Sequence, residues 1–328
     1  MLPLFASKLC QTSITNYFRG LHSSLLVSSV DPNLLASGYA LYTESSSQYP
    51  PPPDYHSSPS RIPMLSKSEA DELAKLVLSH TDDYIHIDHL AGPLPFFTYG
   101  PYWGYHFHLP ENNHHDPSTK TKALLNDSVD KHSLSTLSST TLTYNKAIDL
   151  YRETMLIELK WLYDRIKSQL ADFLNEENKT IKSVSFMGGK FAVPGFHVIP
   201  SHLAWSYPVF RIHTDESFEL FTTLLNHVND SNVDLKSCNP DSRISFTLPI
   251  ALPSPNSGLN FVDFRNVKAG DYKNVKMTRE NYEVGTMVVH SGNLLHQIGN
   301  WDFRNFFSPR ITLQGFGFLC GDEWLIYW

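Results

Sequence analysis

The stretch GTMVVHSGNLLHQIG, residues 285–299, is the clearest guide to the fold of this chain. A glycine opens it, a largely apolar run follows at 287–290, and Ser-Gly-Asn then separates this run from a second apolar one. Short apolar runs of roughly four to eight residues, bounded by Gly, Asn and Ser, are typical of buried β-strands joined by turns. The stretch therefore predicts a short strand at 287–290 that leads into a turn, and no helix.

Similar runs fill the chain after residue 180. They are VSFMG, FAVPGFHVI, PVFRIH, RISFTLPIAL, LNFVDF and RITLQGFGF. Many short strands without a strong helical period indicate an all-β barrel or sandwich. We therefore expect residues 181–328 to form one β-rich domain.

The chain before residue 180 has a helical character. LSKSEADELAKLVLSH, residues 65–80, places Ser66 and Glu69 in a capping-box pattern ahead of an apolar stripe, which predicts a helix. Residues 141–178 carry apolar side chains at a spacing of three to four, which predicts a long helix that supports the core. We expect residues 61–180 to be a helical and loop-rich region that packs on the barrel.

The first 60 residues do not have the pattern of a folded domain. Residues 1–30 contain Lys8 and Arg19, eight serines and threonines and no acidic residue, which is the composition of an organelle transit peptide. Residues 31–60 end in a Pro/Ser-rich run that predicts an extended linker. We therefore expect a mitochondrial protein, with a plastid or the cytoplasm as alternatives.

Composition and charge exclude several functional classes. The net charge of −7 argues against a nucleic-acid partner, because nucleic-acid-binding proteins present a basic patch. No apolar run reaches the roughly 18 residues that span a bilayer, so no membrane segment is expected. Cys10, Cys238 and Cys320 are too far apart to predict a disulfide framework or a zinc ribbon, and they favour a reducing compartment.

Three His-x-Asp pairs offer candidate metal ligands, because residues two apart on an extended strand point to the same side. The pairs at 86/88 and 114/116 have no suitable partners, and we interpret them as chance. His213 and Asp215 end an apolar, strand-like run in the β-rich part. His296 follows a turn there, and a barrel could bring it next to them as the third ligand.

Other residues compete for these roles. His290 is the alternative third ligand, but it lies on the strand and not at the turn, so we favour His296. Arg310 and Thr312 begin an apolar run 14 residues after His296. A guanidinium binds a carboxylate in bidentate fashion, and a hydroxyl two residues further on faces the same side. Arg304 is the second choice, because it precedes the strand.

The order His-x-Asp, distant His, Arg-x-Thr resembles that of the iron(II)/2-oxoglutarate-dependent dioxygenase superfamily, and most closely its prolyl-4-hydroxylase/lysyl-hydroxylase-like branch. The runs FTLPIALP (246–253) and SGLNFVDF (257–264) add to the resemblance, which covers roughly residues 183–318. The resemblance implies an α+β protein with a double-stranded β-helix (jelly-roll) core and supporting N-terminal helices.

The resemblance also implies roles for the candidate residues. His213, Asp215 and His296 would be the catalytic ligands of Fe(II), which leave coordination positions for 2-oxoglutarate and O₂. Arg310 and Thr312 would bind the far carboxylate of 2-oxoglutarate. The implied activity is hydroxylation of a C–H bond in a small molecule or an amino-acid side chain. It would be coupled to decarboxylation of 2-oxoglutarate to succinate and CO₂, with stimulation by ascorbate as an added expectation.

Two other functions stay open on the sequence. One is a cupin-like metalloprotein without 2-oxoglutarate, for example a zinc hydrolase with the same ligands; the other is a non-catalytic binding module. The segment 219–243 is an insertion relative to the family and would either cover the site or form a surface loop. His197 and His202 are interpreted as core residues, with contact to 2-oxoglutarate or substrate as the alternative. Residues 93–110 are interpreted as a loop or a set of short strands, whose aromatic side chains pack on the domain or line a pocket. Neither the substrate nor the oligomeric state is predicted.

Overall fold

The computed structural model describes residues 59–86, 96–101, 144–177, 183–187, 191–206, 215, 237–263, 276–292, 294–301 and 308–328. The chain divides into two units, Met1–Gln48 and Tyr49–Trp328, and all described residues belong to the second unit. The predicted transit peptide lies outside the described residues, as does nearly all of the predicted linker. Among the described residues, no helix is both long and apolar enough to cross a bilayer.

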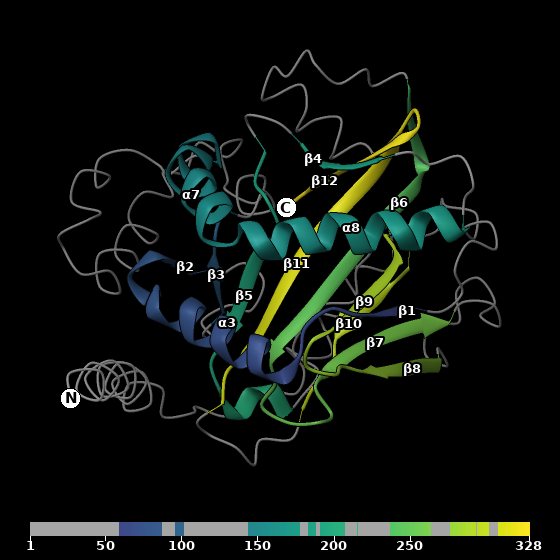
Figure 1. Cartoon of the computed structure of the whole chain (residues 1–328). Coiled ribbons are helices and arrows are strands. Elements are labelled where there is room, and N and C mark those ends of the chain that lie inside the picture. Colours follow the sequence, from purple (N-terminus) through teal and green to yellow (C-terminus); the bar gives the residue numbers. More distant parts are fainter. Residues whose placement is uncertain are drawn as a thin grey trace, which may run out of the picture. The chain divides into compact units, whose positions relative to one another are not determined.

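The described residues form mostly antiparallel sheets, which make up a β-rich, jelly-roll-like fold. The strands are β1 (Ser60–Pro63), β2 (Tyr84–His86), β3 (Phe97–Tyr99), β4 (Ser183–Phe186), β5 (Gly195–Ile199), β6 (Cys238–Ala251), β7 (Gly258–Asp263), β8 (Lys276–Asn281), β9 (Thr286–Ser291), β10 (His296–Ile298), β11 (Arg310–Cys320) and β12 (Glu323–Tyr327). The larger sheet has the order β1-β9-β6-β11-β5-β3-β2, with β12 and β4 beside β11 (Figure 1). The smaller sheet has the order β10-β7-β8.

The stretch 285–299 forms the predicted strand as β9, and it also forms a second strand, β10, which was not predicted and belongs to the other sheet. β9 lies in the larger sheet, between β1 and β6, and β10 lies in the smaller sheet, beside β7. The turn between them therefore carries the chain from one sheet to the other.

Strand alternation gives the larger sheet two different faces. One face is apolar and is formed by Phe97, Tyr99, Phe196, Val198, Phe246, Leu248, Met287, Val289, Ile311 and Leu313. The other face carries buried polar side chains, namely Thr98, His197, Ser245, Thr247, His290, Arg310 and Thr312. The core of the protein lies on the apolar face. The polar face points to the candidate site described below.

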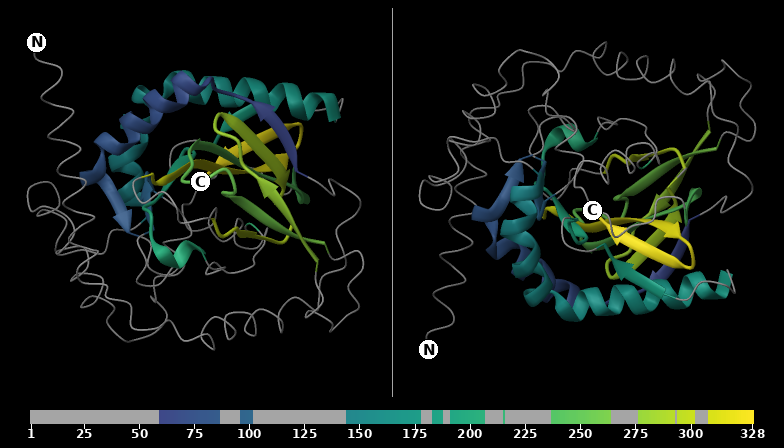
Figure 2. Two further views of the ribbon diagram at one scale, coloured as in Figure 1. Left: turned by 90° about the horizontal axis from the view of Figure 1, so that it is seen from below. Right: turned by 90° about the horizontal axis from the view of Figure 1, so that it is seen from above.

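Helices cover the apolar face of the larger sheet. They are α3 (Lys67–Ser79), α7 (Tyr144–Glu158) and α8 (Lys160–Glu177), and α3 and α8 cross this sheet (Figures 1 and 2). The capping box of α3 forms as predicted, because the Ser66 hydroxyl accepts from the Glu69 amide at 3.3 Å and the Glu69 carboxylate accepts from the Ser66 amide at 2.8 Å.

The single helix predicted at 141–178 is divided into α7 and α8 at Leu159. Its predicted apolar stripe is buried throughout, as Ile148, Tyr151, Met155, Leu159, Leu162, Ile166 and Leu170. The Leu159 amide donates to the Met155 carbonyl, and the Tyr163 amide donates to the Leu159 carbonyl, both at 2.9 Å. Helical hydrogen bonding therefore continues across the break, which changes the direction of the helix without a loop (Figure 1).

Residues before 181 also supply strands: β1 and β2 were not predicted, whereas β3 is one of the short strands left open for the run 93–110. β1 pairs with β9, and β3 pairs with β5 and is followed by β2 at the end of the sheet. β3 comes from the aromatic run at 93–110, and its Phe97 and Tyr99 are buried in the core as the packing interpretation predicted.

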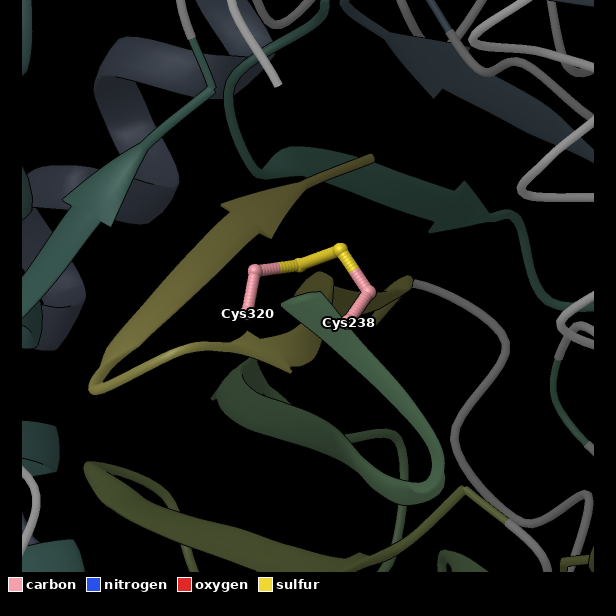
Figure 3. The surroundings of a disulfide bond; sticks show 2 residues. All are labelled: Cys238 and Cys320. Atoms are coloured by element: carbon pink, nitrogen blue, oxygen red, sulfur yellow. A yellow bond between two sulfur atoms is a disulfide. The ribbon is translucent and has the colours of Figure 1, made fainter. Parts of the chain in front are cut away.

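A disulfide joins Cys238, the first residue of β6, to Cys320, the last residue of β11 (Figure 3). The two residues are 82 positions apart in sequence but lie opposite each other in the β6–β11 pair. The expectation that the cysteines form no disulfide is therefore wrong. It was based on their separation in sequence, and strand pairing brings the two residues together in space. Disulfides are typical of oxidising compartments, so the argument for a reducing compartment loses its support.

Candidate metal centre

Asp215, His290 and His296 come together where the two sheets face each other. β9 of the larger sheet supplies His290, and β10 of the smaller sheet supplies His296. His290 Nε2 lies 3.8 Å from Asp215 Oδ2, and His296 Nε2 lies 3.5 Å from Asp215 Oδ1. One ligand atom from each residue lies within 4.8 Å of the other two. Two imidazoles and one carboxylate at such distances form the donor set of a facial metal site.

Backbone carbonyls fix the orientation of both imidazoles. His290 Nδ1 lies 2.9 Å from the Ser291 carbonyl oxygen, and His296 Nδ1 lies 2.9 Å from the Leu294 carbonyl oxygen. A carbonyl oxygen can only accept, so each Nδ1 carries a proton. The pKa of His296 is lowered, so its Nε2 directs a lone pair toward Asp215, and a cation between the two would satisfy both. Metal-binding histidines are held in this way in proteins.

The surroundings of the cluster keep the His296 imidazole in its neutral form, which is the form that binds a metal. Burial lowers the pKa of His296, whereas the Asp215 charge acts to raise it and the neighbouring His290 lowers it again. The pKa stays below the usual value for histidine, so the ring is neutral at pH 7 and offers its Nε2 lone pair. Phe261 packs on both rings, 5.3 Å from that of His290 and 6.0 Å from that of His296 between centroids.

The sequence analysis identified Asp215 and His296, and it kept His290 as the alternative ligand. The structure brings all three together. His213 lies outside the described residues, so its role as a ligand stays a prediction. The sequence did not favour His290, because its place on a strand says nothing about which face of the sheet it occupies. Pairing with Ser245 of β6 places it on the polar face.

The other His-x-Asp pairs do not join the cluster. His86 ends β2, at the end of the larger sheet away from β9. Asp88 and the pair at 114/116 lie outside the described residues. His197 is buried and packs on Phe96, with ring centroids 4.8 Å apart. It also pairs with Thr312 on the polar face of the larger sheet, so its contact with 2-oxoglutarate or substrate stays a prediction.

Arg310 begins β11 and is fully buried, with 0% of its surface exposed. Its guanidinium lies over two aromatic rings, 5.3 Å from that of Tyr282 and 5.7 Å from that of Trp301. Within the described part of the chain, none of its three side-chain nitrogens has a hydrogen-bond acceptor. Burial lowers the pKa of Arg310 to about 10, which still leaves it charged at neutral pH.

A buried charge without a partner is unfavourable, and cation–π contacts offset only part of its desolvation. The aromatic rings stack on the faces of the guanidinium. Its N–H donors, which lie in the guanidinium plane, therefore make no hydrogen bond to these rings. Thr312, two residues further on, is also fully buried, and its hydroxyl has no partner among the described residues. Arg310 and Thr312 thus offer a set of unused donors, as an anion-binding site requires. Arg304 lies outside the described residues.

Tyr282 connects the guanidinium with the metal cluster. Burial raises the pKa of Tyr282 to about 12, the Arg310 charge lowers it, and the Asp215 charge raises it. The ring of Tyr282 packs on the Arg310 guanidinium, and Arg310 lies on the same polar face of the larger sheet as His290. The anion-binding donors and the metal ligands therefore lie on one side of this sheet.

A separate polar pocket of about 600 Å³ lies next to Trp301 and is lined by four asparagines, Ser206 and Arg279. Arg279 donates to Asn260 Oδ1 at 2.8 Å and contacts the carbonyl oxygens of Asn256 and Asn300. These contacts join the two loops that flank the smaller sheet. We therefore interpret Arg279 as a structural residue.

No protein-family model and no curated protein matches this chain. Among solved structures, an N-substituted L-amino acid dioxygenase in complex with alpha-KG from Burkholderia ambifaria AMMD is 13% identical, with a TM-score of 0.32, and the match covers 55% of this chain and 69% of that one. A second structure of an N-substituted L-amino acid dioxygenase from the same organism is 15% identical, with a TM-score of 0.31, over 58% and 77% of the chains. EvdMO1 is 15% identical, with a TM-score of 0.24, over 45% and 30%. Similarity this low does not establish a family.

Proposed function

We propose that this protein is an iron(II)- and 2-oxoglutarate-dependent oxygenase that hydroxylates a C–H bond of a small molecule or an amino-acid side chain. One observation carries the proposal: a candidate metal site and a candidate anion site lie on one face of the larger sheet. The first is the His/His/Asp cluster, whose ligand atoms lie within 4.8 Å of one another. The second is the buried guanidinium of Arg310, which has no acceptor among the described residues. A 2-oxo dicarboxylic acid bound to a metal ion satisfies both.

The strand arrangement supports a double-stranded β-helix as the core. From β6 onward the chain visits the two sheets in turn: β6 in the larger, β7 and β8 in the smaller, β9 in the larger, β10 in the smaller and β11 in the larger. This alternation is the winding of a jelly roll. It also explains why a strand from each sheet contributes one histidine to the same cluster.

The residues present fit Fe(II) and 2-oxoglutarate. Asp215, His290 and His296 would hold the metal, and His213 remains the ligand predicted from the family resemblance. Two imidazoles and one carboxylate with open positions are the donor set of non-haem Fe(II) oxygenases, and the bound iron supplies the chemistry that activates O₂. Arg310 would bind and orient the far carboxylate of 2-oxoglutarate. Phe261 shields the imidazoles from water.

The alternative functions explain less of the site. A zinc hydrolase can use the same three ligands, but it has no need for a buried guanidinium that lacks an acceptor. A non-catalytic module has no need to fix two imidazoles in one tautomer. Both alternatives leave the charge of Arg310 unaccounted for.

The proposal is tested by calorimetric titration of the anaerobic, Fe(II)-loaded protein with two probes. 2-Oxoglutarate carries the far carboxylate, whereas 2-oxobutyrate lacks it. We expect 2-oxoglutarate to bind at least about tenfold more tightly, because a hydrogen bond to a charged group contributes roughly 1.5–3 kcal/mol.

Arg310→Ala provides the matched variant for this experiment. It should weaken binding of 2-oxoglutarate to the level of 2-oxobutyrate and leave 2-oxobutyrate unaffected. Equal affinities of the wild-type protein for the two acids would contradict the assignment of Arg310, and a protein that binds neither acid would contradict the proposed function.

A further inference from the structure

The polar pocket next to Trp301 lies on the face of the smaller sheet that is turned away from the metal cluster. On β7, Asn260 pairs with Arg279 of β8, whereas the next residue, Phe261, pairs with His296 of β10. Neighbouring residues of a strand point to opposite faces of the sheet, so Asn260 and Arg279 lie on the face opposite to the metal ligand. The pocket is therefore a site of its own.

The pocket is large enough for a small molecule. Its volume of about 600 Å³ lies within the range of ligand pockets, which is roughly 300–1,000 Å³. Gly299, which follows β10, makes room for the guanidinium of Arg279, because a Cβ at this position would overlap Arg279 Nη1. The local sequence thus allows a cation to lie in the wall of the pocket.

Arg279 gives this pocket a positive charge that no described residue neutralises. Three of its five N–H groups donate to neutral acceptors, which are Asn260 Oδ1 and the carbonyl oxygens of Asn256 and Asn300. The neighbouring carboxylate of Glu280 forms its ion pair elsewhere. Burial lowers the pKa of Arg279, as expected for a half-buried cation without a counter-ion. The two remaining N–H groups, on Nε and Nη1, are available to an anion.

Asparagine side chains supply neutral donors and acceptors around this charge. Asn256 lies between β6 and β7, Asn281 ends β8, and both are exposed. Among the described residues, the hydrogen bonds of these two asparagines involve only their backbone atoms. A carboxamide has two N–H donors and one oxygen acceptor, so the two side chains together suit a ligand with several hydroxyl groups.

We propose that this pocket binds a small hydroxylated carboxylic acid of the size of a sugar acid. Its carboxylate accepts from the unused N–H groups of Arg279, and its hydroxyl groups pair with the side chains of Asn256 and Asn281. The charge of Arg279 selects an acid over a neutral sugar, because a neutral ligand would bury the guanidinium further without neutralising it. The inference goes beyond the proposed function and does not depend on it.

Calorimetric titration of the full-length protein with glucuronate and with glucose tests the proposal. The two probes differ only at C6, where glucuronate has a carboxylate and glucose has a hydroxymethyl group. We expect glucuronate to bind at least about tenfold more tightly, as for a hydrogen bond to a charged group. Prior saturation with 2-oxoglutarate should leave the affinity for glucuronate unchanged. His296→Ala is the control variant and should bind glucuronate as the wild type does.

Two variants assign the binding to the pocket. Arg279→Gln should weaken glucuronate binding about tenfold or more and should remove the preference over glucose. Because Arg279 also joins two loops, its loss can lower stability, and Asn281→Ala provides a second variant. This change removes a side chain that has no partner among the described residues, so the thermal unfolding midpoint should stay the same. The affinity for glucuronate should fall about two- to tenfold, as for the loss of one neutral hydrogen bond.

Four results would overturn the inference. The wild type could bind no glucuronate, or it could bind glucose and glucuronate equally well, which would show that the charge is not used. Asn281→Ala and Arg279→Gln could both keep the wild-type affinity for glucuronate. His296→Ala could lose glucuronate, which would place the acid at the metal cluster. None of these results bears on the proposed function, and a protein that binds glucuronate but no 2-oxoglutarate would overturn the proposed function alone.

Discussion

At the scale of single residues, the site is built from groups that lower the stability of the ligand-free protein. Arg310 carries a buried charge, and the lone pair of His296 faces the Asp215 carboxylate. Such arrangements lower stability, and a protein that keeps them has a use for them in binding. Removing one of these groups should therefore affect stability and function in opposite directions.

Arg310→Met tests this trade-off, because methionine replaces the buried charge by an apolar chain. We expect the free energy of unfolding of the ligand-free protein to stay equal or to rise by about 1–3 kcal/mol, as for other buried charges replaced by apolar residues. Binding of 2-oxoglutarate should be lost. Urea denaturation and calorimetry measure the two effects, and a clear loss of stability would show that Arg310 has an acceptor in the folded protein.

Alanine variants of the histidines decide which of them bind the metal. Outer-shell partners of metal ligands contribute about 10–100-fold to metal affinity, so loss of a direct ligand should weaken Fe(II) binding by more than about 100-fold. We expect this for His290→Ala and for His296→Ala, with His197→Ala as the control that keeps its iron. Equilibrium dialysis with metal analysis measures the affinity. If His213→Ala loses iron and His290→Ala retains it, the ligand set predicted from the sequence is correct and His290 is only a neighbour.

At the scale of secondary structure, the sequence predicted long and strongly patterned elements better than short ones. The helix with Ser66 and Glu69 and the strand at 287–290 were predicted. β2 and β10 were not, because each has three residues and exists only through pairing with its neighbours. β3 lies in the run 93–110, for which the sequence left a loop or short strands open. Alternation in β11 indicated one apolar face, but it could not show whether the polar side of Arg310 and Thr312 faces water or a buried site.

The N-terminus of α3 makes a prediction about pH. Hydrogen bonds from Arg165 and from Ser66 lower the pKa of Glu69 to about 2. The pKa of Glu69 is thus lower in the folded protein than in the unfolded chain, so its contribution to stability is complete above about pH 4.5 and is lost as the pH falls toward 2. Glu69→Gln should flatten the pH dependence of the unfolding midpoint in this range. An unchanged pH profile would show that the Arg165–Glu69 ion pair does not form in solution.

At the scale of the whole molecule, the disulfide closes a long segment of the chain. The loop between Cys238 and Cys320 contains His290, His296 and Arg310, which are most of the described site. Pairing of β6 with β11 brings the ends of this loop together, and no spacing of cysteines in the sequence could reveal it.

Loss of this disulfide should lower the free energy of unfolding by about 2–4 kcal/mol, because the cross-link restricts the unfolded chain. The Cys238→Ser/Cys320→Ser double variant should show this loss and should not respond to a thiol reductant, whereas the wild type should respond. Cys10→Ser is the control and should behave as the wild type does. Denaturant titration with and without reductant measures the difference, and a wild type that is insensitive to reductant would contradict the cross-link.

The central claim is that a metal ion and a 2-oxo acid bind in one site, and anaerobic absorption spectroscopy tests it most directly. Fe(II) is added to the purified protein, 2-oxoglutarate follows, and the visible spectrum is recorded. A weak charge-transfer band requires iron that is chelated by the keto acid, so we expect it to appear in the wild type and to be absent in Asp215→Ala. Iron that binds without the band would contradict the account and would favour a metalloprotein that does not use 2-oxoglutarate.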